Sequence, residues 1–203
     1  PFTREAHPSY TEKLPALETV RWSIIATRGC PGGCSFCALT MHQGRAVISR
    51  SEKSILNEVA LLTAQNGFKG TISDIGGPTA NAFGSSTKDV DRCGRCRRVS
   101  CYHPSICDNI SHGQDSYLSL LSKARQLRGI KKILVASGIR HDVALLSDRF
   151  IEALAAHHTG GHLKVAPEHV NASVLSLMRK PPLKVFEEFE RRFLLASERA
   201  GLA

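Results

Sequence analysis

Three cysteines near the start of the chain stand close enough together to bind one metal centre. Cys30, Cys34 and Cys37 follow the spacing C-x3-C-x2-C within a glycine-rich run. The residues before them, 22–27, form a short apolar segment that ends at this run, so they are predicted to form a buried strand. Glycine adopts positive φ angles without steric cost, which allows such a loop to wrap tightly around an inorganic centre. We therefore interpret the loop as a metal site and not as core packing.

The number of thiols in this loop limits what it could hold. Iron–sulfur clusters are normally held by four thiolates. A [4Fe–4S] cluster held by three would leave one iron for a molecule other than the protein. From the residues alone, the alternative is a set of three structural or zinc-binding cysteines.

The cysteine loop, with Phe36 just before the third cysteine, resembles the signature of the radical SAM superfamily. Further strings resemble the YgiQ-type family of radical SAM proteins, and together they cover nearly the whole chain: HQGR (42–45), SRSEKSI (49–55), ISDIGGPTAN (72–81), ILVASGIRHD (133–142), HHTGG (157–161) and LKVAPEH (163–169). The resemblance implies that Cys30, Cys34 and Cys37 ligate three irons of a [4Fe–4S] cluster. Its open iron would bind S-adenosylmethionine (SAM) through the amino and carboxylate groups.

The resemblance also implies a reaction, although it does not identify the substrate. The reduced cluster would pass one electron to SAM, the C5′–S bond would break, and a 5′-deoxyadenosyl radical would abstract hydrogen from the substrate. An external one-electron donor of the flavodoxin or ferredoxin type would be needed. RNA or protein modification is one subclass, because HQGR and residues 174–180 resemble methylthiotransferases. The alternative from another class is a non-catalytic iron–sulfur or zinc protein that acts as a scaffold or redox sensor.

The resemblance assigns SAM contacts to two further places. Phe36 would lie against the adenine, with ordinary core packing as its alternative. The Gly76-Gly77 pair stands where many radical SAM proteins carry a Gly-Gly-Glu turn whose backbone holds the methionine amino group. Here Pro78 replaces the glutamate, so only the backbone role carries over.

Two charged residues are candidate contacts for SAM or substrate. Arg140 is a fixed cation that could bind a carboxylate through two parallel hydrogen bonds, either that of the methionine or that of an acidic substrate. A solvated arginine is the alternative. Glu168, just after Pro167, is expected to accept hydrogen bonds from the ribose hydroxyls or the methionine amine, with a surface glutamate as the alternative. Five histidines are candidates for proton transfer, of which only His42 or His169 is expected to face the site: His42, His157, His158, His162 and His169.

A second cysteine group follows the spacing C-x2-C-x4-C-x5-C, with Cys93, Cys96, Cys101 and Cys107. Zinc held by all four thiolates would stabilise this segment structurally. A second iron–sulfur cluster would instead serve electron relay or substrate binding. YgiQ-type sequences are similar at the last three cysteines, whereas their other cysteine lies near Thr87 here. The ligand count is therefore three or four, and unliganded thiols are the remaining alternative.

Length and composition are those of a soluble globular protein with one domain. The chain has 203 residues, of which 42% are hydrophobic and 22% charged, and it has no apolar run long enough to span a membrane. Seven cysteines, most of them closely spaced, do not suit a disulfide framework and do suit metal ligation in a reducing compartment, so we expect a cytoplasmic protein. The chain begins at Pro1 without an initiator methionine, and we expect it to be part of a longer protein.

The charge balance favours an anionic partner such as RNA or a phosphorylated metabolite. The net charge is +9, from 27 basic and 18 acidic residues. Part of the excess is local, because four arginines crowd the second cysteine group, where they would offset thiolate charge: Arg92, Arg95, Arg97 and Arg98. Aromatic residues do not accompany the basic ones, so RNA stays a secondary expectation.

Strand and helix patterns alternate along the chain and predict an α/β fold. Apolar runs predict strands over residues 22–27, 70–75, 133–136 and 163–166. Apolar stripes at helical spacing predict helices after a cap at Ser51, near residue 118, after a cap at Asp148, after Asn171 and near residue 186. Four βα units imply a parallel sheet with right-handed crossovers.

The resemblance implies the architecture of a partial (β/α) radical SAM barrel whose missing strands should follow Ala203. Residues 1–20 are expected to form an extended lead-in and residues 21–203 the core. Residues 79–115 are polar, cysteine-rich and without periodicity, so we expect a functional insertion after the second strand. Sites in such barrels lie at the carboxyl ends of the strands. The cysteine loop, residues 76–78, Arg140 and Glu168 each follow one predicted strand and should share one rim.

Overall fold

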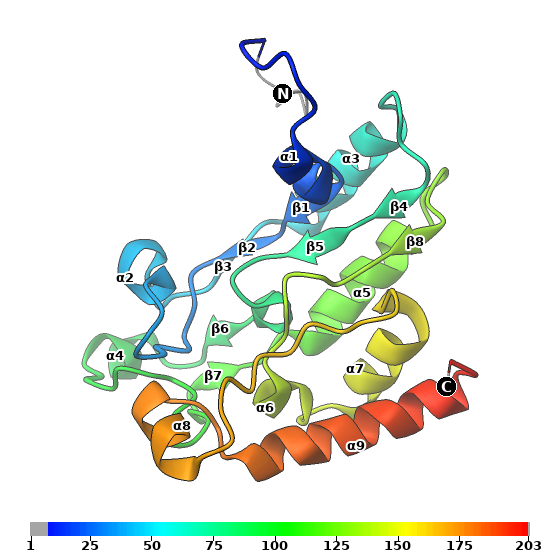
Figure 1. Cartoon of the computed structure of the whole chain (residues 1–203). Helices are drawn as coiled ribbons and strands as arrows, with labels where there is room; N and C mark the ends of the chain where they lie inside the picture. Colours follow the sequence, from blue (N-terminus) through cyan, green and yellow to red (C-terminus); the bar gives the residue numbers. More distant parts are fainter. Residues whose placement is uncertain (1–7, 203) are drawn as a thin grey trace.

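The computed structural model describes residues 8–202, in which four short extended segments lie side by side in chain order (Figure 1). The pairings are all parallel: β1 (Ser23–Ile25) with β5 (Asp74–Gly76), β4 (Thr71–Ile72) with β8 (Lys132–Ile133), and Ile139 with Val165 through a single bridge. The predicted second strand is divided into β4 and β5, and it therefore pairs with the first strand and with the third. The predicted α/β class is confirmed.

The strands are shorter than the apolar runs predicted. The first run ends in β2 (Thr27–Arg28), which leaves β1 and pairs antiparallel with β3 (Ile48–Ser49). The predicted fourth strand, residues 163–166, reduces to the bridge at Val165. It follows two glycines and precedes Pro167, which has no N–H group to continue a ladder.

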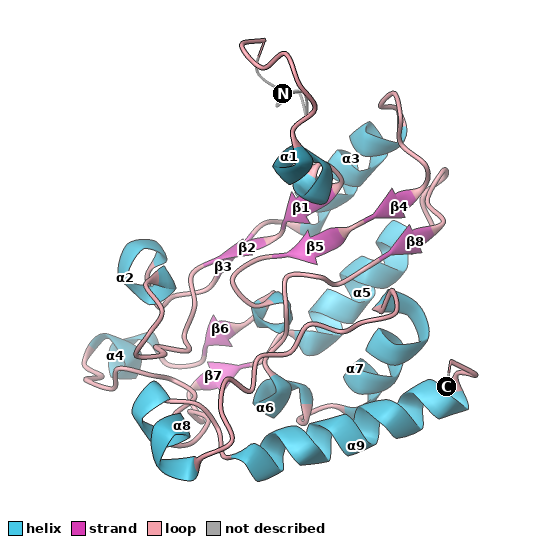
Figure 2. Cartoon of the chain, in the orientation of Figure 1, coloured by secondary structure: helices cyan, strands magenta, loops and turns pink. Residues whose placement is uncertain are grey.

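Four helices form a layer against these strands (Figure 2). They are α3 (Glu52–Thr63), α5 (Gln114–Arg125), α7 (Asp148–Ala153), which continues as the π-helical turn η2 (Leu154–His158), and α9 (Leu183–Arg199). Each contacts the next in chain order. Their buried side chains, among them Ile55, Leu121 and Phe150, share one core with Ile24 and Ile72 of the strands.

The predicted helix starts are confirmed where a side chain caps the first turn. The Ser51 hydroxyl accepts a hydrogen bond from the Ser54 N–H at 3.3 Å, and the Asn171 Oδ1 atom begins α8 (Ala172–Met178) in the same way. The predicted cap at Asp148 is wrong by one residue. Ser147 accepts the hydrogen bond from the Phe150 N–H at 3.2 Å, and Asp148 is the first helical residue.

The lead-in is not extended throughout. Within residues 8–20, the short helix α1 (Pro15–Val20) begins with proline, whose fixed φ suits the first helical position. Residues 1–7 of the predicted lead-in lie outside the described residues. No helix among residues 8–202 is both long enough and apolar enough to cross a membrane.

An insertion over residues 79–115 is not confirmed as a unit separate from the core. Its first residues form the buried 3-10 turn η1 (Ala80–Ala82), and its last ones begin α5. The polar composition of residues 79–115 predicted an insertion, but the amides of Asn81 and Gln114 are buried and donate hydrogen bonds to Arg140 O at 2.8 Å and Val143 O at 2.6 Å. The cysteine-bearing excursion is narrower, between the antiparallel strands β6 (Ser86–Thr87) and β7 (Ile110–Ser111), and it contains α4 (Val90–Gly94).

Candidate metal centre

The loop with Cys30, Cys34 and Cys37 follows β2 and is closed by the short helix α2 (Leu39–Gln43). The Cys30 N–H donates to Gly44 O at 3.0 Å, and the Thr40 hydroxyl donates to Cys30 O at 3.1 Å. All three cysteines are half-buried free thiols. The backbone of the loop is thus fixed, while the three cysteines stay partly exposed.

The last third of the chain also holds this loop. The Ser35 hydroxyl donates to Leu177 O at 2.7 Å, and the Ser35 N–H donates to Met178 O at 3.3 Å. Arg179 donates from Nη1 to Gly33 O at 2.9 Å. These bonds tie the cysteine loop to the end of α8.

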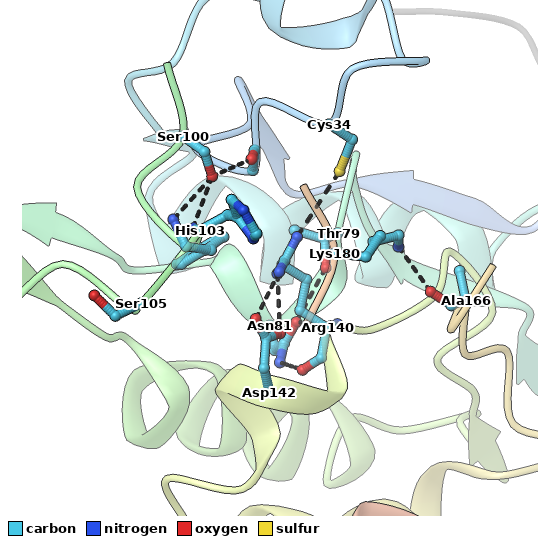
Figure 3. A network of polar contacts seen from close by, with 12 residues as sticks. Cys34, Thr79, Asn81, Ser100, His103, Ser105, Arg140, Asp142, Ala166 and Lys180 are labelled. Carbon is cyan, nitrogen blue, oxygen red and sulfur yellow. Dashed lines mark hydrogen bonds and ion pairs between the residues drawn. The ribbon is translucent and has the colours of Figure 1, made fainter. Parts of the chain in front are cut away.

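Arg140 is buried between the cysteine loop and its own ion-pair partner (Figure 3). It follows the third parallel segment and precedes α6 (His141–Ala144). Nε and Nη2 donate to the carboxylate of Asp142 at 3.0 and 2.5 Å, while Nη1 lies 4.0 Å from the Cys34 sulfur. The guanidinium lies 4.5 Å from the centroid of the Tyr102 ring. Burial excludes the alternative of a solvated arginine.

The backbone of Arg140 is fixed as well. Asn81 accepts a hydrogen bond from the Arg140 N–H at 2.9 Å and donates one to Arg140 O at 2.8 Å. Because Nε and Nη2 of the guanidinium both donate to Asp142, Nη1 is the nitrogen that faces the cysteine loop. A contact between Arg140 and a SAM carboxylate stays a prediction, and it would have to use this nitrogen.

Burial and nearby charge act in opposite directions on the thiols. Burial raises the pKa of the Cys30 thiol, while the Gly32 backbone and the positive charge of Arg140 lower it. Cation binding requires the thiolate form and releases the thiol proton. Arg140 therefore favours the state that a metal centre needs.

The space around Gly32 fits an inorganic centre. A Cβ atom on Gly32 would lie 3.2 Å from Arg140 Nη1, 3.3 Å from the Cys30 sulfur and 3.7 Å from the Cys34 sulfur. Glycine thus keeps a gap open between two thiols and a cation. Within residues 8–202, no three His, Cys, Asp or Glu side chains converge as the ligands of a single ion do. Thiolates that bind different irons of a cluster need not converge on one point, so the residues fit a cluster better than one ion.

The glycine pair after the second strand lies at a separate hollow on the same edge. A cavity of about 340 Å³ is lined by Gly76, Gly77 and Pro78 together with Thr27 and Asp74. A Cβ atom on Gly77 would lie 2.5 Å from Thr27 O, so only glycine allows this close approach of the two strands.

Asp74 is a residue of this cavity that the sequence analysis did not single out. Its Oδ1 atom accepts hydrogen bonds from the N–H groups of Ala136 and Ser137 at 2.8 and 3.0 Å. Burial raises the pKa of the Asp74 carboxyl, and these hydrogen bonds act against the shift. A carboxylate inside a predicted strand with no other charged residue was the signal that could have identified it.

Phe36 and Glu168 meet through Lys180, which the sequence analysis also missed. The Phe36 ring is 53% exposed, which excludes core packing, and Lys180 Nζ lies 5.9 Å from its centroid. The same nitrogen lies 3.2 Å from the Glu168 carboxylate and donates to Ala166 O at 2.7 Å. Glu168 has a φ of 75°, a strained value for a residue with a side chain. The predicted fourth segment therefore reaches the cysteine loop.

The four cysteines of the second group line one cavity of about 370 Å³. Cys93 is exposed, and Cys96, Cys101 and Cys107 are half-buried. Burial raises the pKa of the Cys101 thiol, while the charges of Arg45 and Arg98 lower it.

A family model of the radical SAM superfamily matches residues 24–196. The chain belongs to this superfamily. Three similar proteins each match 99% of this chain. UPF0313 protein YgiQ of Escherichia coli is 46% identical over 28% of its own length, and UPF0313 protein blr7973 of Bradyrhizobium diazoefficiens is 46% identical over 30% of its length. A UPF0313 protein of Thermotoga petrophila is 48% identical over 36% of its length. The resemblance to YgiQ-type proteins is confirmed. The chain spans about a third of the length of these curated relatives.

Membership of the radical SAM superfamily implies a [4Fe–4S] cluster, SAM and a partial β/α barrel. The short parallel segments with helices packed against them agree with such a barrel. Of the candidate proton-transfer residues, His42 is exposed, and the His169 Nδ1 atom accepts a hydrogen bond from the Asn171 N–H at 2.9 Å. Their role in this radical SAM chain stays a prediction.

Proposed function

We propose that this chain is the cluster- and SAM-binding part of a radical SAM enzyme. Cys30, Cys34 and Cys37 would hold three irons of a [4Fe–4S] cluster. When bound, the cluster and SAM supply the reductive cleavage that begins hydrogen abstraction from a substrate. An external one-electron donor and a reducing, cytoplasmic location belong to the same proposal.

One observation carries this proposal: the gap that Gly32 keeps open between two cysteine sulfurs and the buried guanidinium of Arg140. The motif supplies three thiols and leaves one corner of a cubane for another ligand. Arg140 places a cationic nitrogen 4.0 Å from the Cys34 sulfur, and Asp142 holds the guanidinium in place. A purely structural metal site needs neither a buried cation nor a free corner.

Three places are proposed to hold SAM. The backbone of Gly76 and Gly77 lines a cavity and would bind the methionine amino group. The exposed ring of Phe36 would lie against the adenine. Glu168 would accept hydrogen bonds from the ribose or the amine, and its strained backbone supports a functional role.

The substrate belongs to the whole protein, of which this chain is one part. RNA or protein modification remains the proposed subclass, supported by the basic charge balance. The second cysteine group is proposed to bind a metal centre of its own.

The test is the release of 5′-deoxyadenosine from SAM by the full-length protein, reconstituted anaerobically with iron and sulfide and then reduced. We expect release by the wild type and none by Cys34→Ala, which removes one thiolate. Met41→Ala is the matched control, because this side chain is 86% exposed on the adjacent helix α2. A wild type that holds its cluster and releases no 5′-deoxyadenosine would contradict the proposal and favour a redox sensor or scaffold.

A further inference from the structure

A cavity beside the paired strands β6 and β7 is lined by all four cysteines of the second group. Cys93, Cys96, Cys101 and Cys107 all line its wall, and its volume is about 370 Å³. All four are free thiols. No residue of the radical SAM motif at positions 30–37 contributes a sulfur to it, so it is distinct from the site already described.

The backbone of this segment is folded so that the cysteines face one space. The Cys96 N–H donates to Cys93 O at 3.1 Å, and the Cys107 N–H donates to Cys101 O at 2.8 Å. The base of the excursion is closed by Asn109, whose side chain accepts from the Asp89 N–H and donates to Asp89 O, both at 2.8 Å. Unliganded thiols in a loose loop would not require this arrangement.

Three arginines line the same cavity and supply positive charge. Arg98 donates from Nη2 to the carbonyl oxygens of His103 and Ser105 at 3.1 and 2.6 Å, and Arg45 donates to Arg98 O. Arg92 pairs with Asp108 at 2.8 Å. A centre bound by four thiolates carries net negative charge, which nearby guanidinium groups stabilise.

The arrangement of the four thiols favours a cluster over a single zinc ion. Zinc requires four sulfurs about 2.3 Å from one point. Within residues 8–202, no three potential ligands converge in that way. The cavity of about 370 Å³ leaves room beside the four thiols for a centre larger than one ion. We propose that Cys93, Cys96, Cys101 and Cys107 bind a second iron–sulfur cluster of the [4Fe–4S] type.

The proposed second cluster lies next to the first site. The Cys101 N–H donates to Pro31 O at 2.8 Å, and the Ser100 hydroxyl donates to Gly32 O at 2.5 Å. Another hollow, of about 550 Å³, is lined by Cys34 and Cys37 from one loop and by Cys96 from the other. Because the two loops are in direct contact, we expect two reduced clusters at these sites to affect each other's EPR spectra.

The experiment is iron and acid-labile sulfide analysis of the full-length protein after anaerobic reconstitution, with EPR spectra after reduction. We expect about eight irons per chain in the wild type, because each cluster contains four. The double variant Cys101→Ala/Cys107→Ala should lose half of the iron, and its EPR spectrum should lose the broadening caused by a second centre. Ser105→Ala is the matched control, because this exposed residue lies between the two cysteines and should leave both values unchanged.

A variant without the first site separates this proposal from the proposed function. Cys30→Ala/Cys34→Ala/Cys37→Ala should retain about four irons and the EPR signal of one cluster, even if SAM cleavage is never observed. If the double variant fails to fold, the single variant Cys93→Ser replaces it in the test, because Cys93 is exposed. Cys93→Ser should retain less iron than the wild type. Zinc in place of iron at the second site, or wild-type iron content in both second-group variants, would overturn the proposal.

Discussion

Arg140 is a buried cation whose contacts are divided between Asp142 and the cysteine loop. Both members of this ion pair are less than a tenth exposed, so neither charge is solvated if the other is removed. Breaking a buried pair is far more destabilising than replacing both of its members with apolar groups. Asp142 therefore holds the positive charge of Arg140 beside the thiols. The contribution of this pair to stability is best measured by substituting one of its residues at a time.

Asp142→Asn should lower the free energy of unfolding by about 3 kcal/mol, because it leaves the Arg140 charge buried and unpaired. Denaturant unfolding of the metal-free protein measures this value. The matched control is Asp115→Asn, whose ion pair with Arg149 is 3.8 Å long and largely exposed, and which should change stability by less than about 1 kcal/mol. Equal effects of the two substitutions would show that Arg140 is not held as described.

At the scale of elements, the two cysteine segments are packed backbone against backbone. Gly33 has a φ of 57°, and a Cβ atom on it would lie 2.0 Å from Val99 O. Together with the hydrogen bonds from Ser100 and Cys101 to the first loop, this contact makes the two segments one assembly. A displacement of one segment must move the other.

Gly33→Ala should be more destabilising than a glycine substitution in an open place. Gly67→Ala is the matched control, since its φ of 83° imposes the same left-handed backbone while no atom lies within 4 Å of the added methyl group. The control should lower the free energy of unfolding by about 1–2 kcal/mol. Gly33→Ala should lower the free energy of unfolding by more than the control does, and it should also reduce iron incorporation. Equal losses in denaturant unfolding would contradict the close packing of the two segments.

Local signals explain which elements the sequence predicted. The cap at Ser51 and the buried positions of α3 lie within one helix, so their pattern was readable. The strand lengths and the burial of Asn81 depend on partners far along the chain, which no local pattern reveals.

The candidate site divides in the same way. The cysteine spacings were visible in the sequence, whereas the partners of the predicted charges were not. Lys180 is recognised as a partner of Glu168 only in the fold, and the Arg140–Asp142 pair, although local in the sequence, is recognised as buried only there. The shared cavity of the second cysteine group likewise depends on the hairpin of β6 and β7, whose two-residue strands carry too little pattern to predict.

The stability of the whole molecule should fall as the pH decreases below neutrality. His158 is 2% exposed, and its ring lies 2.9 Å from Ile133 O through Nδ1. Burial lowers the pKa of His158 from 6.5 to about 4, the charges of Arg125 and His157 act in the same direction, and the hydrogen bond to Ile133 opposes them. Burial lowers the pKa of His141 to about 4 as well.

Between pH 6.5 and 4 the unfolded chain binds protons that the folded chain does not, so the free energy of unfolding decreases as the pH falls through this range. One such histidine contributes at most about 3 kcal/mol. His158→Asn keeps a donor for Ile133 O and removes the titration, so denaturant unfolding at several pH values should show a flatter dependence. The control is the exposed His162, and His162→Gln should retain the wild-type slope. An unchanged slope in His158→Asn would contradict the assignment.

The bonds from the end of α8 to the cysteine loop affect how the protein is made. Ser35 and Gly33 receive partners that lie 142 and 146 positions later in the chain. A ribosome must therefore translate most of this stretch before the loop gains those contacts. The cysteines of the first loop leave the ribosome before the residues that bind this loop have been synthesised. We therefore expect cluster insertion to follow synthesis of residue 179 and not to occur when the motif first emerges.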